Sequence, residues 1–318
     1  MKTKTAILLL LIFLFTNCKQ KSYLREESLP AHPNEINISG AFALAPLVQV
    51  WINEFQKINP KVKFELNTIG SGRGLVEVLK GRTDLAMVSS EIPRGIDSTL
   101  WVIPVARLAV VPIINNKNPY IAEINKKGIT RDVLVDLFSG NNMKSWGDLY
   151  GNPGKDPIHV YYRSDSSGAT DVLARYLWLQ SKDMRGKGID GEDKMIAAIK
   201  KDPLALGYCN FIYAFDPKSR LFFPELNVLP LDINNDGKIE AKENFYDSVV
   251  HLQRAMWVGK YPCALNRDLY LVSKVKPNTK EVVEFIKWVL TDGQRFVPEM
   301  GYIELHSSET QTSLNALK

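Results

Sequence analysis

Apolar residues recur with two alternating periods in the first part of the globular chain. Ordered structure should begin near Ile36, after which apolar residues first fall at helical spacing. Val62, Phe64 and Leu66 then alternate with polar residues, a shorter helical pattern follows, and an apolar strand pattern covers residues 85–88. The order strand, helix, strand, helix, strand predicts a parallel sheet covered by helices. The apolar positions of the first helical pattern are Leu44, Leu47, Val48, Trp51, Phe55 and Ile58.

The remainder of the chain predicts a second unit. A long extended pattern over residues 102–119 ends in a polar loop, where we place the crossing into a second lobe. Further on, a strand pattern at 159–163 leads into a helix, and an extended pattern returns after residue 261. Asn278 and Thr279 are expected to cap a final apolar helix. The sequence therefore predicts an α/β protein whose two lobes comprise residues 34–111 with 261–318, and residues 112–260.

The first residues indicate export. An apolar run from Ala6 to Phe15 follows two lysines and is far shorter than the ~20 residues that a membrane-spanning helix needs. Residues 1–17 are therefore expected to be a signal peptide, and Cys18 resembles the lipid-attachment site of bacterial lipoproteins. Residues 18–33 are polar and would form a tether to the membrane. Ordinary cleavage nearby, without lipid, is the alternative, because Asn17 replaces the usual small residue.

The charge argues against nucleic acid as a partner. The formal net charge is +5, and residues 1–17 carry two lysines and no acidic residue, so removing them leaves +3. Such a mild excess does not suggest nucleic-acid binding. The hydrophobic content of 45% and charged content of 24% are those of a globular protein. Beyond Cys18, only Cys209 and Cys263 remain, and the sequence leaves open whether they pair or stay free thiols.

Three turns rich in glycine and serine each stand between a strand pattern and a helix pattern. They cover residues 39–43, 70–74 and 163–170. Such turns direct unpaired backbone N–H groups into the space before a helix, where the helix dipole also favours negative charge. Ser and Thr hydroxyls add donors, and Arg163 can bind two oxygens of a tetrahedral ion. Together the three turns predict a site for a small oxyanion.

The order of these segments is similar to that of a known family. The motifs ISGAFALAPL, IGSGRG, TDLAMVSS, RSDSSGAT and YPCALNRDLYLV occur in sequence between Ile36 and Tyr302. They resemble the phosphate-binding proteins of bacterial phosphate ABC transporters, a PstS-like branch of the type II periplasmic binding proteins. The resemblance implies two lobes of mixed, mainly parallel sheet joined by hinge crossings. It also implies a phosphate ligand in the interlobe cleft and an ABC transporter permease as partner.

The resemblance also suggests which residues touch the anion. Matching positions are Ala43, Ser71, Arg163, Ser167 and Gly168, and Ser90, Asp165 and Thr170 complete the expected site.

Two hydroxyl positions depart from the pattern. Ala41 and Phe42 stand where hydroxyls are usual, and Ala169 precedes Thr170. Because hydrogen phosphate carries a proton, it needs an acceptor that sulfate does not, and Asp165 and Glu91 are the acidic candidates. The alternative interpretations are that Asp165 only orients Arg163 and that Glu91 is a solvated loop residue. Sulfate, molybdate or tungstate therefore remain alternative ligands.

A second site is predicted from spacing alone. Residues 232–243 read DINNDGKIEAKE, which fits the twelve-residue calcium loop. Gly237 occupies the sharp turn at position six, and Glu240 could act through water at position nine. A strand pattern precedes the loop, so we expect a structural Ca²⁺ site rather than a helix-loop-helix sensor; the alternative is a turn without metal. The expected ligands are Asp232, Asn234, Asp236, the Lys238 carbonyl and Glu243.

The motifs of common enzymes are missing from the sequence. The four histidines are scattered, and the chain has no HExxH, GxSxG or GxxxxGK[ST] motif. We therefore expect a lipid-anchored binding protein of the periplasm or cell surface that is not an enzyme. A surface scaffold lipoprotein that keeps the fold without a ligand is the alternative from another class.

Overall fold

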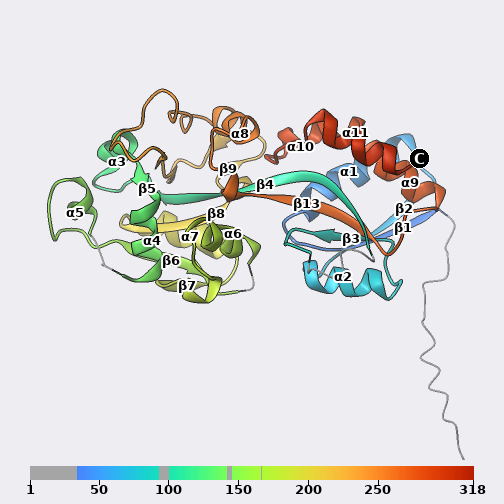
Figure 1. The fold of residues 1–318 in the computed structure, drawn as a ribbon, viewed down its shortest axis with the longest axis horizontal. Coiled ribbons are helices and arrows are strands. Elements are labelled where there is room, and N and C mark those ends of the chain that lie inside the picture. The colour runs from blue at the N-terminus through green and yellow to red at the C-terminus, as the bar shows by residue number, and fades with distance from the viewer. Residues whose placement is uncertain (1–33, 93–99, 142–144, 166) are drawn as a thin grey trace, which may run out of the picture.

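The computed structural model describes residues 34–92, 100–141, 145–165 and 167–318, and in it two lobes lie side by side (Figure 1). Lobe one begins with three parallel strands in the order β2, β1, β3. This confirms the parallel unit predicted from the alternating periods. Its elements are β1 (Glu35–Gly40), α1 (Ala45–Ile58), β2 (Lys63–Thr68), α2 (Ser71–Leu79) and β3 (Leu85–Val88).

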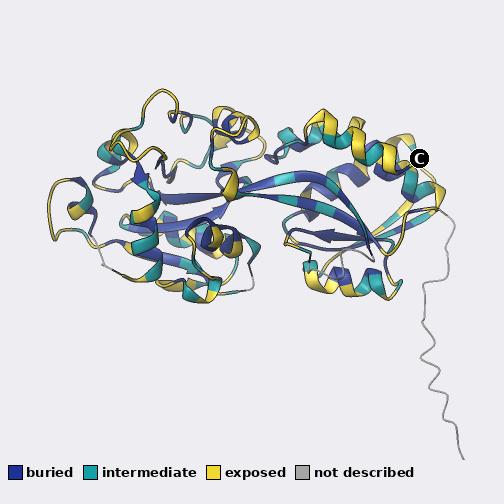
Figure 2. Ribbon diagram, in the orientation of Figure 1, coloured by how far each residue is buried: buried dark blue, intermediate teal, exposed yellow. Residues whose placement is uncertain are grey.

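Two long antiparallel strands join the lobes. Strand β4 (Trp101–Asn115) pairs with β13 (Asn266–Ser273) in lobe one and then continues into lobe two, where it pairs with β8 (Ala205–Asn210). Among the described residues, nine strands thereby form one sheet that runs through both lobes. Figure 2 shows β4 and β8 buried for most of their length, which explains their nearly continuous apolar sequence.

Lobe two completes the sheet and covers it with helices. Strand β8 pairs in parallel with β6 (His159–Arg163), which pairs with β7 (Lys187–Ile189), and β11 (Leu226–Val228) adds to β4. A short parallel pair, β5 (Ile129–Thr130) with β12 (Leu231–Asp232), lies at its outer edge, and β9 (Phe215–Asp216) pairs with β10 (Leu221–Phe222). The helices are α3 (Ile121–Lys127), α4 (Arg131–Ser139), α5 (Trp146–Tyr150), α6 (Gly168–Tyr176), α7 (Glu192–Lys201) and α8 (Val249–Trp257).

The C-terminal segment returns to lobe one and closes its core. Helix α9 (Lys280–Val289) packs on α1, where the rings of Phe55 and Phe285 meet edge to face with centroids 5.3 Å apart. The Trp51 indole N–H donates to the Gly293 carbonyl at 2.8 Å, which ties α1 to the residues that directly follow α9. Helices α10 (Phe296–Glu299) and α11 (Ser307–Ala316) follow.

Each lobe has its own hydrophobic core, and the boundary between the cores lies inside a strand. Leu108 belongs to the core of lobe one, whereas Ala109 begins that of lobe two. The chain therefore changes lobe within β4, three residues before the predicted boundary at 111/112 and not in the polar loop that follows, because β4 is long enough to pair with strands in both lobes. The capping prediction also needs correction: Thr279 is the N-cap residue of α9, but its side chain makes no capping hydrogen bond.

Candidate anion-binding cleft

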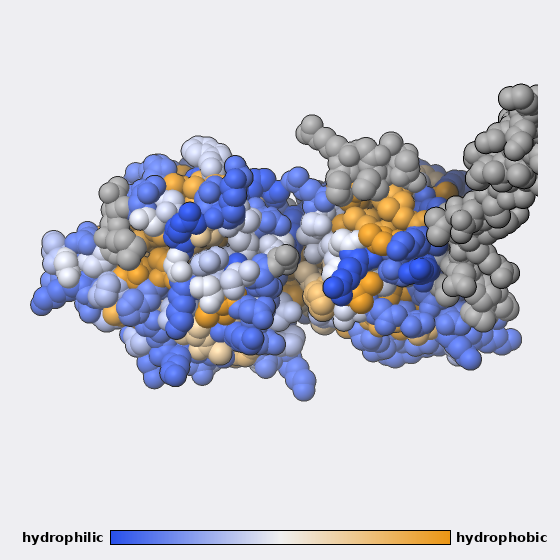
Figure 3. All heavy atoms as spheres, turned by 90° about the horizontal axis from the view of Figure 1, so that it is seen from below, coloured by the Kyte–Doolittle hydropathy of each residue, from blue (hydrophilic) through white to orange (hydrophobic). Residues whose placement is uncertain are grey.

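A cavity of about 960 Å³ lies between the two lobes. The view from below shows the molecule narrowing to a waist between its two halves (Figure 3). The three glycine- and serine-rich turns of the sequence all contribute to its lining, so the fold brings together segments that are up to about 130 positions apart in the chain. This is the convergence that the turns predicted.

The glycine- and serine-rich turns of lobe one line the cleft with small neutral groups. The Ser71 hydroxyl, at the start of α2, accepts the Ser89 N–H at 3.1 Å and lies 3.4 Å from the Ser89 hydroxyl. Ser90, next along the chain, lies exposed at the cleft. Ala43 also lines it, and its carbonyl accepts the Tyr302 hydroxyl at 2.8 Å. Hydroxyl and backbone N–H donors on this wall suit an anion without adding charge.

The turn before α1 depends on a glycine. Gly40 has φ of +135°, and a Cβ at this position would lie 2.2 Å from the Met87 carbonyl oxygen. The close approach allows the Ala41 N–H to donate to that same oxygen at 2.9 Å, so β1 and β3 hold the turn directly. Backbone packing thus positions the turn that carries Ala43. The alanine side chain at residue 43 does not disturb that packing.

Lobe two presents the N-terminus of α6 to the cleft. Ser167 is the N-cap, and its hydroxyl oxygen accepts the Ala169 N–H at 3.2 Å. Thr170 also lines the cleft, but its hydroxyl lies 2.7 Å from that of Tyr208, which accepts the Arg163 N–H at 3.0 Å. Tyr208 therefore fixes the end of β6 against the start of α6, and the Thr170 hydroxyl takes part in that support.

Arg163 is held by two carboxylates. Its Nε and Nη2 donate to Asp165 at 2.6 and 2.5 Å, and its Nη1 lies 2.9 Å from Glu192 Oε1. Burial lowers the pKa of Arg163, but its bonds to Asp165 and the charge of Glu192 outweigh burial and raise it. The hydrogen bond from Arg163 in turn lowers the pKa of Asp165. Arg163 stays charged, and Asp165 orients it as one of the two sequence interpretations proposed.

Glu192, which begins α7, is a cleft residue that was not predicted from the sequence. Asn210 donates to its Oε1 through the side-chain amide, whereas the buried Oε2 has no hydrogen-bond partner among the described residues. Burial raises the pKa of this carboxyl, and the charge of Arg163 opposes the rise only in part. The cleft thus contains a buried carboxylate oxygen that can accept a proton from a ligand.

Arg267, on β13, is a second buried arginine in the cleft. Its Nη2 donates to Asn210 Oδ1 at 2.8 Å, while its Nε and Nη1 are buried without a hydrogen-bond partner among the described residues. It lies so close to the start of α6 that a Cβ at Gly168 would be 2.3 Å from Nη1. Burial lowers the pKa of Arg267 to about 10, so the side chain is charged at neutral pH. Its unused donors point to a missing acceptor.

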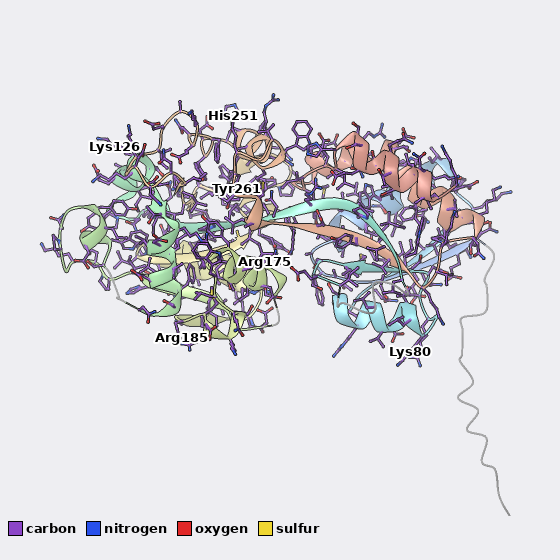
Figure 4. All side chains as sticks on the ribbon, in the orientation of Figure 1. Lys80, Lys126, Arg175, Arg185, His251 and Tyr261 are labelled. Atoms are coloured by element: carbon purple, nitrogen blue, oxygen red, sulfur yellow. The ribbon has the colours of Figure 1, made fainter. Side chains whose placement is uncertain are left out.

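The other predicted acceptor, Glu91, lies outside this cluster. Its side chain is 84% exposed and pairs with Arg175 of α6 at 2.6 Å, so it bridges the two lobes at the surface. Figure 4 shows Arg175 on the side of lobe two that faces lobe one. The structure also answers the question left open for the cysteines: Cys209 is buried, Cys263 is exposed, and neither forms a disulfide.

The residues that sequence reasoning missed gave unequal signals. Arg267 alternates with Leu269 and Leu271 on the buried face of β13, so the strand pattern could have marked it as an inward-facing charge. Glu192 follows a glycine at the start of an amphipathic helix, as many solvated acids do, and gave no such signal. Only the packing of α7 against β8 places Glu192 in the cleft.

The predicted calcium loop lies away from the cleft, at the outer edge of lobe two. It begins at β12 and lies beside the end of α3, where Lys126 is labelled in Figure 4. Within the described ranges, no three His, Cys, Asp or Glu side chains cluster closely enough to hold a metal as they stand. The predicted signal peptide, Cys18 and the tether lie outside the described residues. No helix in the described ranges has the length and apolarity to cross a membrane.

The fold and cleft define a class of protein. A model of the PBP superfamily domain matches residues 27–293, and the chain belongs to this superfamily. Its architecture is the two-lobed type II periplasmic-binding-protein fold that the motifs predicted.

Relatives in other organisms are similar over most of the chain. The Phosphate-binding protein PstS of Bacillus subtilis is 28% identical, over 88% of this chain and 84% of the relative. That of Methanocaldococcus jannaschii is 26% identical, over 89% and 85%. These relatives confirm the resemblance seen in the motifs.

A solved structure shares the fold. A putative phosphate ABC transporter substrate-binding protein with bound phosphate from Clostridium perfringens has a TM-score of 0.66 and 21% identity, over 86% of this chain and all of that one. At this identity the likeness concerns the fold alone.

Proposed function

We propose that this protein captures phosphate in the cleft between its lobes and delivers it to the permease of an ABC transporter. The observation that carries the proposal is the pair of buried arginines beside the N-terminus of α6. Arg267 has two buried donor nitrogens without a partner among the described residues, and the charged Arg163, held by Asp165 and Glu192, lies in the same cleft. Buried donors without partners cost stability, and an oxyanion would satisfy them. The names of the similar relatives support phosphate as the ion.

The two walls suit a dehydrated anion in different ways. Lobe one offers the Ser71 and Ser90 hydroxyls, the backbone near Ala43 and Arg267 of β13, while lobe two offers Ser167, Gly168 and Arg163. An ion bound to both walls would join the lobes, so closure should follow ligand binding.

Glu192 is the group that we propose distinguishes phosphate from sulfate. Its buried Oε2 has no donor of its own in the described structure. Hydrogen phosphate carries a proton that this oxygen can accept, whereas fully ionised sulfate would meet only repulsion. Glu192 would therefore take the role that the sequence analysis had assigned to Asp165 or Glu91, since Asp165 is occupied by Arg163 and Glu91 is at the surface.

Calorimetric titration with phosphate, sulfate and molybdate tests the function. We expect phosphate to bind most tightly, and Glu192→Gln to reduce the preference for phosphate over sulfate by about tenfold, the effect of one hydrogen bond of ~1.4 kcal/mol. Tighter binding of sulfate or molybdate by the parent protein would assign another oxyanion to the cleft. If none of the three binds at millimolar concentration, the protein is better explained as a scaffold that has lost its ligand.

We further propose export and lipid anchoring through Cys18. The short apolar run that ends beside this cysteine supports the proposal. Cys18→Ser should release the protein from the membrane fraction, because the thiol is the only proposed site of acylation. If the variant sediments with membranes as the parent does, the protein is held there in another way.

A further inference from the structure

The 232–243 loop buries two carboxylates at its ends. Asp232 is 2% exposed and Glu243 is 6% exposed. Asp232 accepts the Gly237 N–H at 2.8 Å, and Glu243 Oε1 accepts the Ile233 N–H at 2.8 Å, so the last acidic side chain of the loop reaches back to its first residues. Both ends of the loop are therefore drawn together around its interior before any ion is considered.

These buried carboxylates have no positive partner in the described part of the chain. Among the described residues neither Asp232 nor Glu243 forms an ion pair, and the nearby Lys238 pairs instead with Glu240 at 2.6 Å. Glu243 Oε2 is buried and has no hydrogen-bond partner within the described structure. An unpaired buried carboxylate is costly, which distinguishes this loop from a simple Asx-rich turn, whose acids would be solvated.

The backbone of the loop has the sharp turn that a calcium loop needs. Asn235 and Gly237, at positions four and six, both have left-handed backbone, with φ of 60° and 79°. The Glu243 N–H donates to the Glu240 carbonyl at 2.8 Å, which forms one helical turn at the end of the loop. This turn places the carboxylate of the twelfth residue on the same side as Asp232.

We propose that this loop binds one Ca²⁺ ion. Asp232, Asn234 and Asp236 would provide side-chain oxygens, Lys238 its carbonyl, and Glu243 both carboxylate oxygens, which reaches the roughly six oxygens that Ca²⁺ requires. The Asp236 and Asn234 side chains now bond to each other at 3.1 Å, so binding requires both to turn inward. That rearrangement explains why three acidic side chains of the loop do not already converge.

The ion would fasten the outer edge of lobe two. The Ile239 N–H donates to the Lys126 carbonyl at 2.8 Å, and Leu231 and Asp232 pair with Ile129 and Thr130. Through these hydrogen bonds the loop and β12 hold the end of α3 and the start of α4. In Figure 1 the loop lies above α3. Because the cleft lies elsewhere in the molecule, Ca²⁺ should stabilise this edge without changing anion affinity.

Calcium titration of the full chain tests the site. After chelator treatment, we expect calorimetry to show one Ca²⁺ per chain, with a dissociation constant of about 10⁻⁴–10⁻³ M, as in extracellular calcium modules. Millimolar CaCl₂ should raise the melting temperature by several degrees relative to NaCl of equal ionic strength. Glu243→Gln should weaken Ca²⁺ binding at least tenfold, because position twelve supplies two oxygens.

Two further variants guard against misfolding and nonspecific effects. Asp236→Asn changes an exposed ligand and should also weaken Ca²⁺ binding in a chain whose melting temperature without Ca²⁺ is unchanged. Asp247→Asn, an exposed acid paired with His251 outside the loop, should bind Ca²⁺ as the parent does. The proposal is overturned if the parent binds no Ca²⁺, if NaCl raises the melting temperature equally, or if Glu243→Gln keeps the parental affinity.

Discussion

The cleft and the 232–243 loop both bury charged side chains, but the cleft balances its charges and the loop does not. Arg163 lies between Asp165 and Glu192. Asn210 links Arg267 to the same Glu192, because it accepts a hydrogen bond from Arg267 and donates one to Glu192. In the loop, the buried carboxylates accept hydrogen bonds from backbone N–H groups of the loop itself, and no cation of the described residues pairs with them. A balanced cluster can remain folded while it waits for a ligand, whereas an unbalanced one is completed by an ion of opposite charge.

The two cleft arginines also differ in whether a carboxylate compensates their charge. Arg163 compensates two carboxylates, while Arg267 has no direct carboxylate partner among the described residues. A charge that compensates others supports the fold, and a buried charge without its own counterion is retained at a cost to the fold. Stability and phosphate affinity should therefore separate when the two arginines are changed one at a time.

The largest effect is expected from Arg163→Ala. This change leaves Asp165 and the buried Glu192 without their cation, so the free energy of unfolding should fall by about 3–5 kcal/mol, and phosphate binding should be lost. Urea denaturation and calorimetry measure the two effects. Adding Glu192→Gln should recover part of the stability because it removes one uncompensated carboxylate. A single variant as stable as the parent would show that Arg163 does not balance the cluster.

Arg267→Met should lower phosphate affinity without lowering the free energy of unfolding. It removes two unused donors but keeps most of the side-chain volume, so phosphate affinity should fall by about 1.5–3 kcal/mol, or roughly ten- to a hundredfold. The free energy of unfolding should be unchanged or higher, because a buried charge without a direct counterion is gone. Parental phosphate affinity in a folded Arg267→Met protein would remove Arg267 from the site.

The pH dependence of stability should reveal Glu192. Burial raises the pKa of its carboxyl in the folded protein above the ordinary value of 4.5, which applies to the unfolded chain. At pH values between 4.5 and the raised pKa, the folded protein therefore holds more protons than the unfolded chain. This carboxyl therefore makes the free energy of unfolding fall as pH rises through that window. In Glu192→Gln that contribution should be missing, as urea denaturation at a series of pH values would show. Parallel pH profiles for parent and variant would contradict the assignment.

The smallest effect is expected at the surface bridge between the lobes. Glu91 and Arg175 form an exposed pair, which solvent screens, so Glu91→Gln should change stability and phosphate affinity by no more than about 1 kcal/mol. Small-angle scattering on the variant should give the same ligand-induced decrease in radius of gyration as on the parent. A larger effect would mean that this bridge, and not the cleft cluster, controls how the lobes meet.

The sequence predicted many elements of lobe one and the anion-binding turns, because both depend on local chemistry. Period two marked β2, a continuous apolar run marked β3, helical spacing marked α1 and α9, and the glycine- and serine-rich turns marked the helix starts at Ser71 and Gly168. The calcium-loop spacing was equally local, since all of its proposed ligands lie within twelve positions. Its backbone turn at Gly237 agrees with that spacing, although binding itself stays a prediction.

Only the tertiary structure decided which charges meet. Glu192 and Arg267 are 75 positions apart, and Asn210 links them because β8, the start of α7 and β13 converge beside β4. No local pattern encodes that contact, so the sequence offered Asp165 and Glu91 as acidic candidates and did not indicate Glu192. Glu91 lies at the surface, as its interpretation as a solvated loop residue expects. Local periodicity determines where a helix or strand forms, but the energy of a buried charge depends on residues that only the folded sheet brings within a few ångströms.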